Sequence, residues 1–275
     1  MTTRVSDDVR FEWGPAGAAA LAPSSSCLVV VDVLSFSTSV TVAVEAGTRV
    51  YPCAWPAGPA AEPAESDSAA EFARSHRAEL AVGRRAVSAA RPWSLSPAAL
   101  RRAPFLPRLV LPSPNGSAIC AAAAEGAGVG AGVGLGVGVA IDLRAVTVIA
   151  GCLRNAAAIG RFLRGSPGPV TVIAAGERWP DGSLRPALED LLGAGAILAA
   201  LRGPGGLDSL SPEAEAARAR FEATADVAAA VSGCTSGREL IEGGFGDDVT
   251  IAAEIDACLV VPALADGAFT AAPGQ

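Results

Sequence analysis

The sequence predicts an α/β fold, a three-layer α/β/α domain around a mostly parallel or mixed central sheet. A unit of apolar strand, polar turn and helix recurs along the chain, which is typical of this class. The first unit begins with the β-branched run 29–31, and two more begin near Leu109 and Val146. Hydrophobic residues make up 51% of the 275 residues, enough for a large core. We expect a single domain over residues 1–275.

The first half of the chain predicts these elements in order. The segment VRFEWGP predicts an edge strand, and residues 27–33 a buried central strand. A helix over 36–46, closed by Gly47, and a strand over 49–52 complete a βαβ unit. The remaining expectations are a loop over 54–63, an amphipathic helix over 68–77, a short strand over 79–82, and irregular surface with one short helix near Pro97 over 84–107.

The second half predicts further units of the same kind. Apolar runs predict strands over 109–111, 146–150, 170–174 and 258–261, and helices over 156–163, from Glu189 onward, and over 211–231 with Pro212 in the first turn. The motifs SGREL and GGFGDDV each open a short helix, the second capped by Asp247 and Asp248. We expect the tail after Asp266 to be frayed. The tract 126–138 has glycine at every second position, which predicts a flexible insertion loop. This alternation does not supply the GxGxxG spacing of a dinucleotide-binding motif.

Composition excludes several classes of protein. All 21 basic residues are arginine, so a Walker A lysine and a Schiff-base lysine are excluded. The chain has a single histidine, His76, which excludes a His-rich metal site. We expect His76 on a surface helix. A net charge of -7 without a basic run argues against a nucleic-acid partner. Six cysteines without a CxxC pair predict reduced thiols, and we expect a cytoplasmic protein with no signal peptide and no membrane contact.

Polar residues follow the predicted strands where an α/β sheet binds ligands. Asp32 ends the first strand, and the hydroxyl groups of Ser35, Ser37 and Thr38 follow at a helix N-terminus that can hold a phosphate-like anion. Later turns supply Asn115, Gly116, Ser117, Arg154 and Asn155. Glu177 follows a strand, and Glu189 and Asp190 open a helix, so these acids are candidate ligands of a divalent cation. Each feature also has a structural interpretation. The hydroxyl groups after Asp32 could be ordinary N-caps, residues 115–117 a turn with a serine cap, and Arg154 a solvated side chain. Glu189 and Asp190 could be partners of the helix dipole.

Six motifs in order resemble the 2-phosphosulfolactate phosphatases of the ComB type. They are VVVDVLSFSTSV, LPSPNGS, GCLRNAAAIG, AAGERWPDGSLRPALEDLLGAGAI, SGREL and the run from DDV to VVPALADG. The resemblance implies an α/β/α fold and a Mg²⁺-dependent acid phosphatase. Its reaction converts (2R)-O-phospho-3-sulfolactate to 3-sulfolactate and phosphate, a step toward coenzyme M. The family commonly carries DVLR, whereas this chain has Ser35 in place of the arginine; Arg154 or Arg185 could substitute for it.

The residues leave two mechanisms open. Asp32 could attack phosphorus or orient a metal-bound water, and Glu177 is the second candidate catalytic acid. The phosphoaspartate signature DxDx(T/V) is absent, because Leu34 occupies the position of its second aspartate. This favours attack by a metal-bound water over attack by Asp32. The expected metal ligands are Asp32, Glu177, Glu189 and Asp190, and the expected partner is a small anionic phosphomonoester. The alternative function is a non-catalytic module that binds an anionic metabolite. An exposed apolar helix over 191–201 could pair two subunits as a homodimer.

Overall fold

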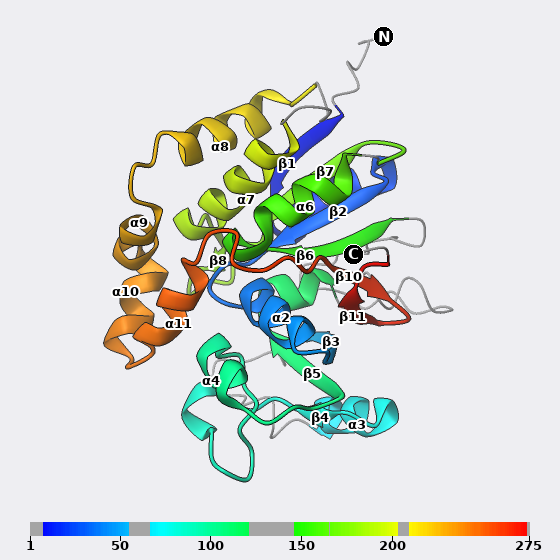
Figure 1. The fold of residues 1–275 in the computed structure, drawn as a ribbon, viewed down its shortest axis with the longest axis vertical. Coiled ribbons are helices and arrows are strands. Elements are labelled where there is room, and N and C mark those ends of the chain that lie inside the picture. The colour runs from blue at the N-terminus through cyan, green and yellow to red at the C-terminus, as the bar shows by residue number, and fades with distance from the viewer. Residues whose placement is uncertain (1–7, 55–66, 121–145, 165, 203–208, 274–275) are drawn as a thin grey trace.

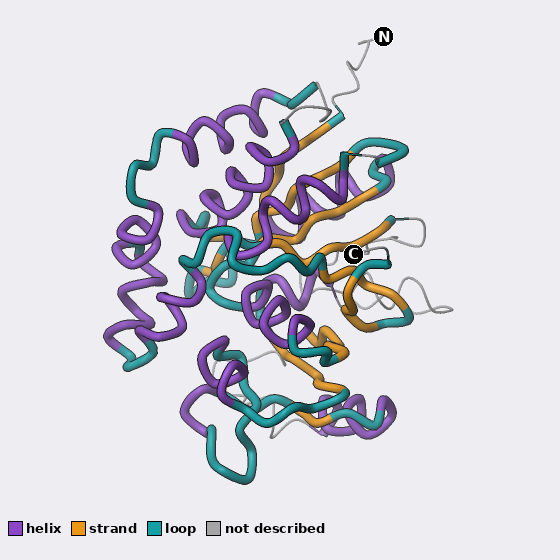
Figure 2. The backbone as a smooth tube through the Cα atoms, in the orientation of Figure 1, coloured by secondary structure: helices purple, strands orange, loops and turns teal. Residues whose placement is uncertain are grey.

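A mixed sheet forms the centre of the protein (Figure 1). A computed structural model describes residues 8–54, 67–120, 146–164, 166–202 and 209–273. Within these residues nine strands join one sheet in the order β1-β7-β2-β6-β10-β11-β3-β5-β4, and helices lie on both of its faces (Figure 2). The predicted α/β three-layer fold with a mixed sheet is therefore confirmed. The Gly-rich tract 126–138 lies outside the described residues, and the single domain stays a prediction.

The sheet consists of two parallel groups separated by an antiparallel hairpin. The first group is β1 (Val9–Trp13), β7 (Val170–Ala174), β2 (Cys27–Val31) and β6 (Thr147–Gly151). The second is β3 (Arg49–Ala54), β5 (Arg108–Ser113) and β4 (Glu79–Leu80). Between them lies the hairpin of β10 (Pro262–Ala265) and β11 (Ala268–Ala271). A two-stranded ribbon, β8 (Glu177–Arg178) with β9 (Leu184–Arg185), follows β7.

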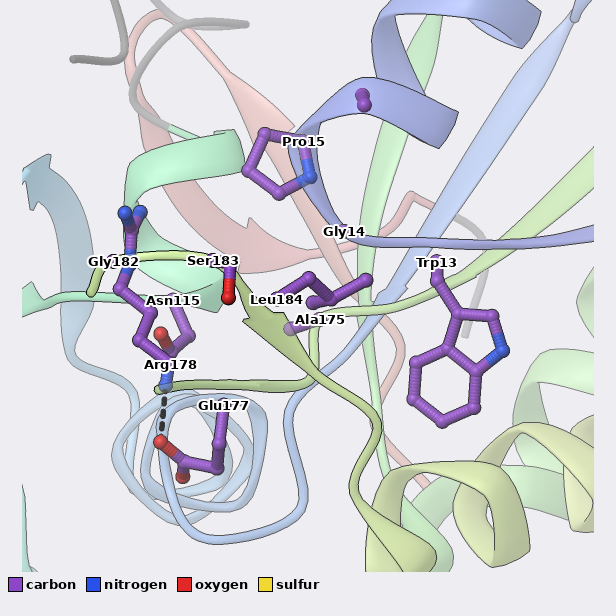
Figure 3. A pocket seen from close by; sticks show the side chains of 11 residues that line it. Trp13, Gly14, Pro15, Asn115, Ala175, Glu177, Arg178, Gly182, Ser183 and Leu184 are labelled. Atoms are coloured by element: carbon purple, nitrogen blue, oxygen red, sulfur yellow. Dashed lines mark hydrogen bonds between the residues drawn. The ribbon is translucent and has the colours of Figure 1, made fainter. Parts of the chain in front are cut away.

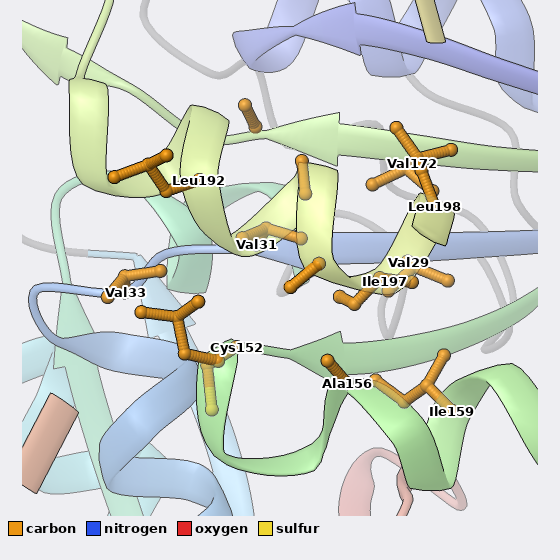
Figure 4. Packing of buried hydrophobic residues seen from close by; sticks show 14 of the residues in the cluster. Val29, Val31, Val33, Cys152, Ala156, Ile159, Val172, Leu192, Ile197 and Leu198 are labelled. Atoms are coloured by element: carbon orange, nitrogen blue, oxygen red, sulfur yellow. The ribbon is translucent and has the colours of Figure 1, made fainter. Parts of the chain in front are cut away.

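Strand β2 is buried on both faces, as its unbroken apolar run predicts. Val29 and Val31 belong to one hydrophobic cluster with α6 (Ala156–Leu163) and α7 (Leu188–Leu201) (Figure 4). Leu28 and Val30 belong to a second cluster with α1 (Gly14–Leu21) and α2 (Phe36–Glu45). The alternation places one cluster on each side of the strand and fixes its carboxyl end between the two layers.

The remaining helices lie at the edges of the two layers. These are α3 (Asp67–His76), α4 (Pro97–Arg102), α8 (Pro212–Glu222), α9 (Val227–Gly233), α10 (Thr235–Glu242) and α11 (Gly246–Ala252), with short 3₁₀ turns at Ala22–Ser24, Arg84–Ala86 and Leu153–Asn155. The long helix predicted over 211–231 is wrong. Asp226 starts a new helix there, because its carboxylate accepts a hydrogen bond from the N–H of Ala229 at 2.8 Å.

Two further predictions about the C-terminal region are wrong. Residues 258–261 form no strand, and the chain after Asp266 is not frayed. It forms β11 inside the sheet, where Phe269 is fully buried and packs edge-to-face against Phe36. Asp247 and Asp248 do not cap α11 either: Phe245 is its N-cap, Asp247 pairs with Arg102 on the surface, and Asp248 is buried.

The apolar helix expected to pair two subunits is covered by the protein itself. It is α7, whose 14 residues pack against α6 and α8, and a Cβ on Gly195 would lie 2.4 Å from the carbonyl oxygen of Ala217. This helix therefore offers no dimer surface. His76 lies at the end of α3, where its ring packs against Tyr51 and Phe72. Among the described residues all six cysteines are free thiols, and none of the helices there is both long and apolar enough to cross a membrane.

Candidate active site

A polar pocket of about 270 Å³ lies at the end of β2. The turn after β2, the turn after β5, the ribbon after β7 and helix α10 all contribute to its wall. Its lining residues are Asp32, Leu34, Ser35, Arg84, Leu95, Ser113, Pro114, Asn115, Glu177, Ser236, Glu239 and Leu240. The pocket brings together three predicted site segments that are more than 60 residues apart in the chain.

Asp32 is held rigidly at the floor of this pocket. Its side chain is 4% exposed, and its two oxygens accept hydrogen bonds from the N–H of Phe36 at 3.0 Å and of Gly116 at 2.9 Å. A Cβ at position 116 would lie 2.8 Å from the Asp32 Cβ, so only glycine allows this approach. The first N–H of α2, which we expected to hold a substrate anion, therefore holds the carboxylate of Asp32.

Burial shapes the charge of the acids around Asp32. Burial raises the pKa of Asp32, while its two backbone hydrogen bonds and the more distant charge of Arg84 lower it. Burial also raises the pKa of Asp190 well above its usual range, with repulsion from Asp32 and Glu189 adding to it. Burial first, and repulsion from Asp32 second, raise the pKa of Glu177 to about 7. The site thus carries more negative charge than its surroundings compensate.

Glu177 connects the ribbon after β7 with the turn after β5. Its Oε2 accepts a hydrogen bond from Nδ2 of Asn115 at 2.9 Å (Figure 3). Asn115 and Glu177 were predicted as site residues from separate strands. The structure places both on the pocket wall with Asp32.

Glu189 and Asp190 lie behind this wall and do not line the pocket. Asp190 is 3% exposed and joins two strand ends, accepting hydrogen bonds from the N–H of Val33 at 2.7 Å and of Gly176 at 2.8 Å. Glu189 is equally buried and interacts with the thiol of Cys234. Asp190 therefore positions the segments that carry Asp32 and Glu177.

The donor set of the pocket fits a magnesium ion only in part. Within the described residues no three acidic, histidine or cysteine side chains converge on one point as a complete metal cage. Mg²⁺, however, usually binds through one or two carboxylates and keeps several waters or substrate oxygens. Asp32 is a buried and Glu177 a half-buried carboxylate on the pocket wall, and each oxygen that accepts one hydrogen bond retains a further lone pair. These two residues fit the ion, whereas Glu189 and Asp190 do not face the pocket.

Arg84 is the cation of the pocket, and the sequence analysis missed it. Its Nε donates to the carboxylate of Asp248 at 3.0 Å, and its Nη2 donates to Oγ of Ser35 at 2.6 Å. Asp248 is 1% exposed and is fixed by Oγ of Ser96 at 2.5 Å and the N–H of Ala98 at 3.1 Å. A buried carboxylate thus aims the guanidinium at Ser35, the position at which the sequence resemblance leads us to expect an arginine.

Comparison with known proteins identifies the second half of the chain. Residues 139–267 match the family model described as 2-phosphosulpholactate phosphatase. This segment, somewhat less than half of the chain, is similar to that phosphatase family. The resemblance predicted from the motifs is confirmed there, and four of the six motifs lie within it. No curated protein matches the chain.

The family segment contributes a wall of the pocket whose residues were not among the predicted site residues. Its SGREL motif forms the first turns of α10 and places Ser236, Glu239 and Leu240 on the pocket wall. The segment also contains Glu177 and Asp190 but neither Asp32 nor Arg84. The pocket therefore combines the phosphatase-family segment with the amino-terminal half of the chain.

Several residues expected to bind substrate instead support the loops. The structure places Ser37, Thr38, Ser117 and Asn155 in hydrogen bonds to strand-end backbone, outside the pocket lining. Gly116 allows the backbone to come close enough to donate its N–H to the carboxylate of Asp32. Arg185 lies beside the pocket, with Nη2 3.7 Å from the carboxylate of Glu239 and its guanidinium over the ring of Trp179.

Arg154 does not reach the pocket and has a structural role. Its side chain is 3% exposed and pairs with Glu254 at 3.1 Å and Glu45 at 3.2 Å, and it also donates to Oγ1 of Thr41. Its contact with substrate, predicted from the strand-end position, is not supported. The ion pairs tie the loop after β6 to α2 and to the segment after α11.

We expect Arg154→Ala to lower the free energy of unfolding by roughly 1.5–3 kcal/mol. The buried guanidinium loses its ion pairs with Glu45 and Glu254 and its hydrogen bond to Thr41, although Glu254 keeps Arg101 as a partner. Urea unfolding would measure the loss, and the KM of the folded enzyme should stay within about twofold. Arg161→Ala, at an exposed arginine on α6, is the matched control. A large rise in KM with unchanged stability would instead place Arg154 at the substrate.

The pKa of Glu177 predicts a pH dependence in metal-free protein. Below pH 4.5 the folded and unfolded states both carry the proton, whereas between pH 4.5 and about 7 only the folded state keeps it. Stability from this group therefore falls as pH rises through that window. In EDTA, the Tm advantage of Glu177→Gln over wild type should grow up to about pH 7 and then level. An advantage independent of pH, or an equal one in Glu239→Gln, would contradict the assignment.

Proposed function

We propose that this protein is a magnesium-dependent phosphatase that hydrolyses (2R)-O-phospho-3-sulfolactate or a related small phosphomonoester. One observation carries the proposal: the buried carboxylate of Asp32 and the fixed guanidinium of Arg84 line the same pocket. A phosphatase needs a group that binds the phosphate oxygens and a group that prepares the attack on phosphorus. The family segment that closes the pocket supports the same reading.

The chain's own residues divide this work. Arg84 binds the phosphoryl oxygens, since its guanidinium is part exposed to the pocket while Asp248 holds Nε. The hydroxyl group of Ser35 already accepts from Arg84 and can donate its proton to a phosphate oxygen. A Mg²⁺ ion held by Asp32 and Glu177 would offset the charge of substrate and acids and polarise the phosphoryl group.

Asp32 acts by orienting water rather than by attacking phosphorus. Both of its oxygens accept backbone hydrogen bonds, which hold the carboxylate in place and reduce its nucleophilicity. Leu34 stands where a phosphoaspartate enzyme carries its second acid. A fixed carboxylate at a strand end is suited to positioning a water for in-line attack.

The experiment that tests this function measures phosphate release from phosphosulfolactate and a panel of small phosphomonoesters, each with Mg²⁺ and with EDTA. We expect Mg²⁺-dependent release, with the preferred ester identifying the substrate. Folded protein that releases no phosphate from any ester in Mg²⁺ would overturn the proposal. Thermal stabilisation by these esters without release would then favour the non-catalytic binding module.

A further inference from the structure

A second pocket, of about 200 Å³, adjoins the polar one. It lies between the start of α1 and the ribbon of β8 and β9. Trp13 and Pro15 form one side, Leu184 the other, and Ala175 contributes from the end of β7 (Figure 3). This wall is apolar, in contrast to the acids and arginine of the neighbouring pocket.

Two glycines give this pocket its shape. Gly14 and Gly176 have φ angles of +61° and +68°, which favour glycine. A Cβ on Gly176 would lie 2.6 Å from Cδ1 of Leu184, so any other residue would displace the leucine that forms the wall. The N–H of Gly176 is fixed by Asp190, so the residue that positions the polar site also fixes the apolar one.

The two pockets share a wall. Asn115 and Glu177, joined by their 2.9 Å hydrogen bond, line both of them. A ligand whose phosphate lies near Arg84 could therefore extend past this pair into the apolar space. The two pockets are therefore direct neighbours, with the side chains of Asn115 and Glu177 between them.

The charges around the second pocket disfavour a further anionic group. Among the described residues that line it, Arg178 is the single cation, and it is exposed and donates to the carbonyl oxygen of Pro114 at 3.2 Å. Glu177 adds a carboxylate at the shared wall. A sulfonate placed here would lose its hydration against Trp13 and Leu184 without a dedicated partner.

We propose that this pocket binds an apolar substituent of the phosphomonoester substrate, such as a phenyl or branched alkyl group on the phosphorylated hydroxy acid. The inference rests on the proposed function and narrows its substrate class. Burial of such a group against Trp13, Pro15 and Leu184 discriminates in favour of apolar esters, and one or more carbon groups in an apolar pocket change kcat/KM by about 10- to 200-fold.

The test compares O-phospho-3-phenyllactate with O-phospho-3-sulfolactate, which differ in the terminal group alone. Wild type should show at least about tenfold higher kcat/KM for the phenyl ester. Ala16→Phe fills the pocket from an exposed position of α1 and should remove most of that preference while sparing the sulfonate ester. Ala20→Phe, one turn further along the exposed side of α1, should keep it.

Calorimetry with the unphosphorylated 3-phenyllactate and 3-sulfolactate gives a readout independent of hydrolysis. Tighter binding of the phenyl compound, weakened in Ala16→Phe, is expected. Equal or better use of the sulfonate ester, or an Ala16→Phe effect of the same size on both esters, would overturn the inference while leaving the phosphatase intact. Absence of phosphate release from both esters would instead count against the proposed function, and the calorimetry would still decide the pocket.

Discussion

Asp32→Asn should lower kcat for phosphate release on the order of 10³-fold, the range expected when a residue that directs proton transfer or water is lost. The amide keeps the size of the side chain but removes its charge. It also places an NH₂ group against one of the two N–H donors, of Phe36 or Gly116, that hold the carboxylate. Both effects disturb the fixed acceptor that the proposed mechanism needs.

The comparison requires a folded variant and a matched substitution. Thermal unfolding of Asp32→Asn should be followed in parallel, because the change also removes repulsion among buried acids. Asp247→Asn, at an acid whose side chain is 77% exposed, is the control and should retain full activity. A folded Asp32→Asn protein with near wild-type kcat would remove Asp32 from the mechanism.

Arg84→Ala should lower kcat/KM by about 10- to 100-fold, chiefly by raising KM, because a charge-assisted bond to phosphate is worth about 1.5–3 kcal/mol. Arg84→Lys should recover only part of the loss, since lysine cannot reach Asp248, Ser35 and the phosphate with one planar fork. Initial rates over a range of ester concentrations separate KM from kcat.

Arg102→Ala is the control for this prediction, because Arg102 forms an exposed ion pair with Asp247 on the neighbouring surface. Asp248→Asn tests the positioning role separately. It keeps Arg84 in the chain but weakens its anchor, so it should raise KM less than Arg84→Ala. Unchanged KM in Arg84→Ala would show that phosphate binds elsewhere.

Local patterns predicted most of the elements because the relevant interactions lie close in sequence. The apolar run of β2, the strand at Val170–Ala174 and the helix at Ala156–Leu163 all match. The break in the helix predicted over 211–231 is a local N-cap at Asp226, whereas the error in the C-terminal tail arose where a distant contact decides. The C-terminal tail becomes β11 because Phe269 packs against Phe36, more than 200 residues away, and no local pattern signals that partner.

The ends of the predicted strands indicated candidate site residues but not which of their side chains face the same pocket. Asp32, Asn115 and Glu177 were predicted because polar residues after buried strands are conspicuous. The structure brings them to one pocket, and their roles there stay predictions. Arg154 occupies an equally suggestive position, yet its side chain turns toward Glu254 and Glu45. Sequence position locates a residue at a sheet edge but does not give the direction of its side chain.

Arg84 illustrates the opposite case. It lies in an Arg-rich stretch that resembles ordinary surface, and its role depends on Asp248, which is 164 residues away. The signal that was available is the missing arginine at Ser35. A site that lacks an expected cation invites a search for another arginine, and here Arg84 donates directly to Oγ of Ser35.

A crystal structure with Mg²⁺ and inorganic phosphate is the sharpest test of the proposed active site, because hydrolysis of any phosphomonoester releases phosphate. We expect phosphate in the polar pocket within hydrogen-bond distance of Arg84, and the metal on Asp32 and Glu177. Phosphate bound at another place in an active protein, with the Asp32 pocket holding only water, would contradict it.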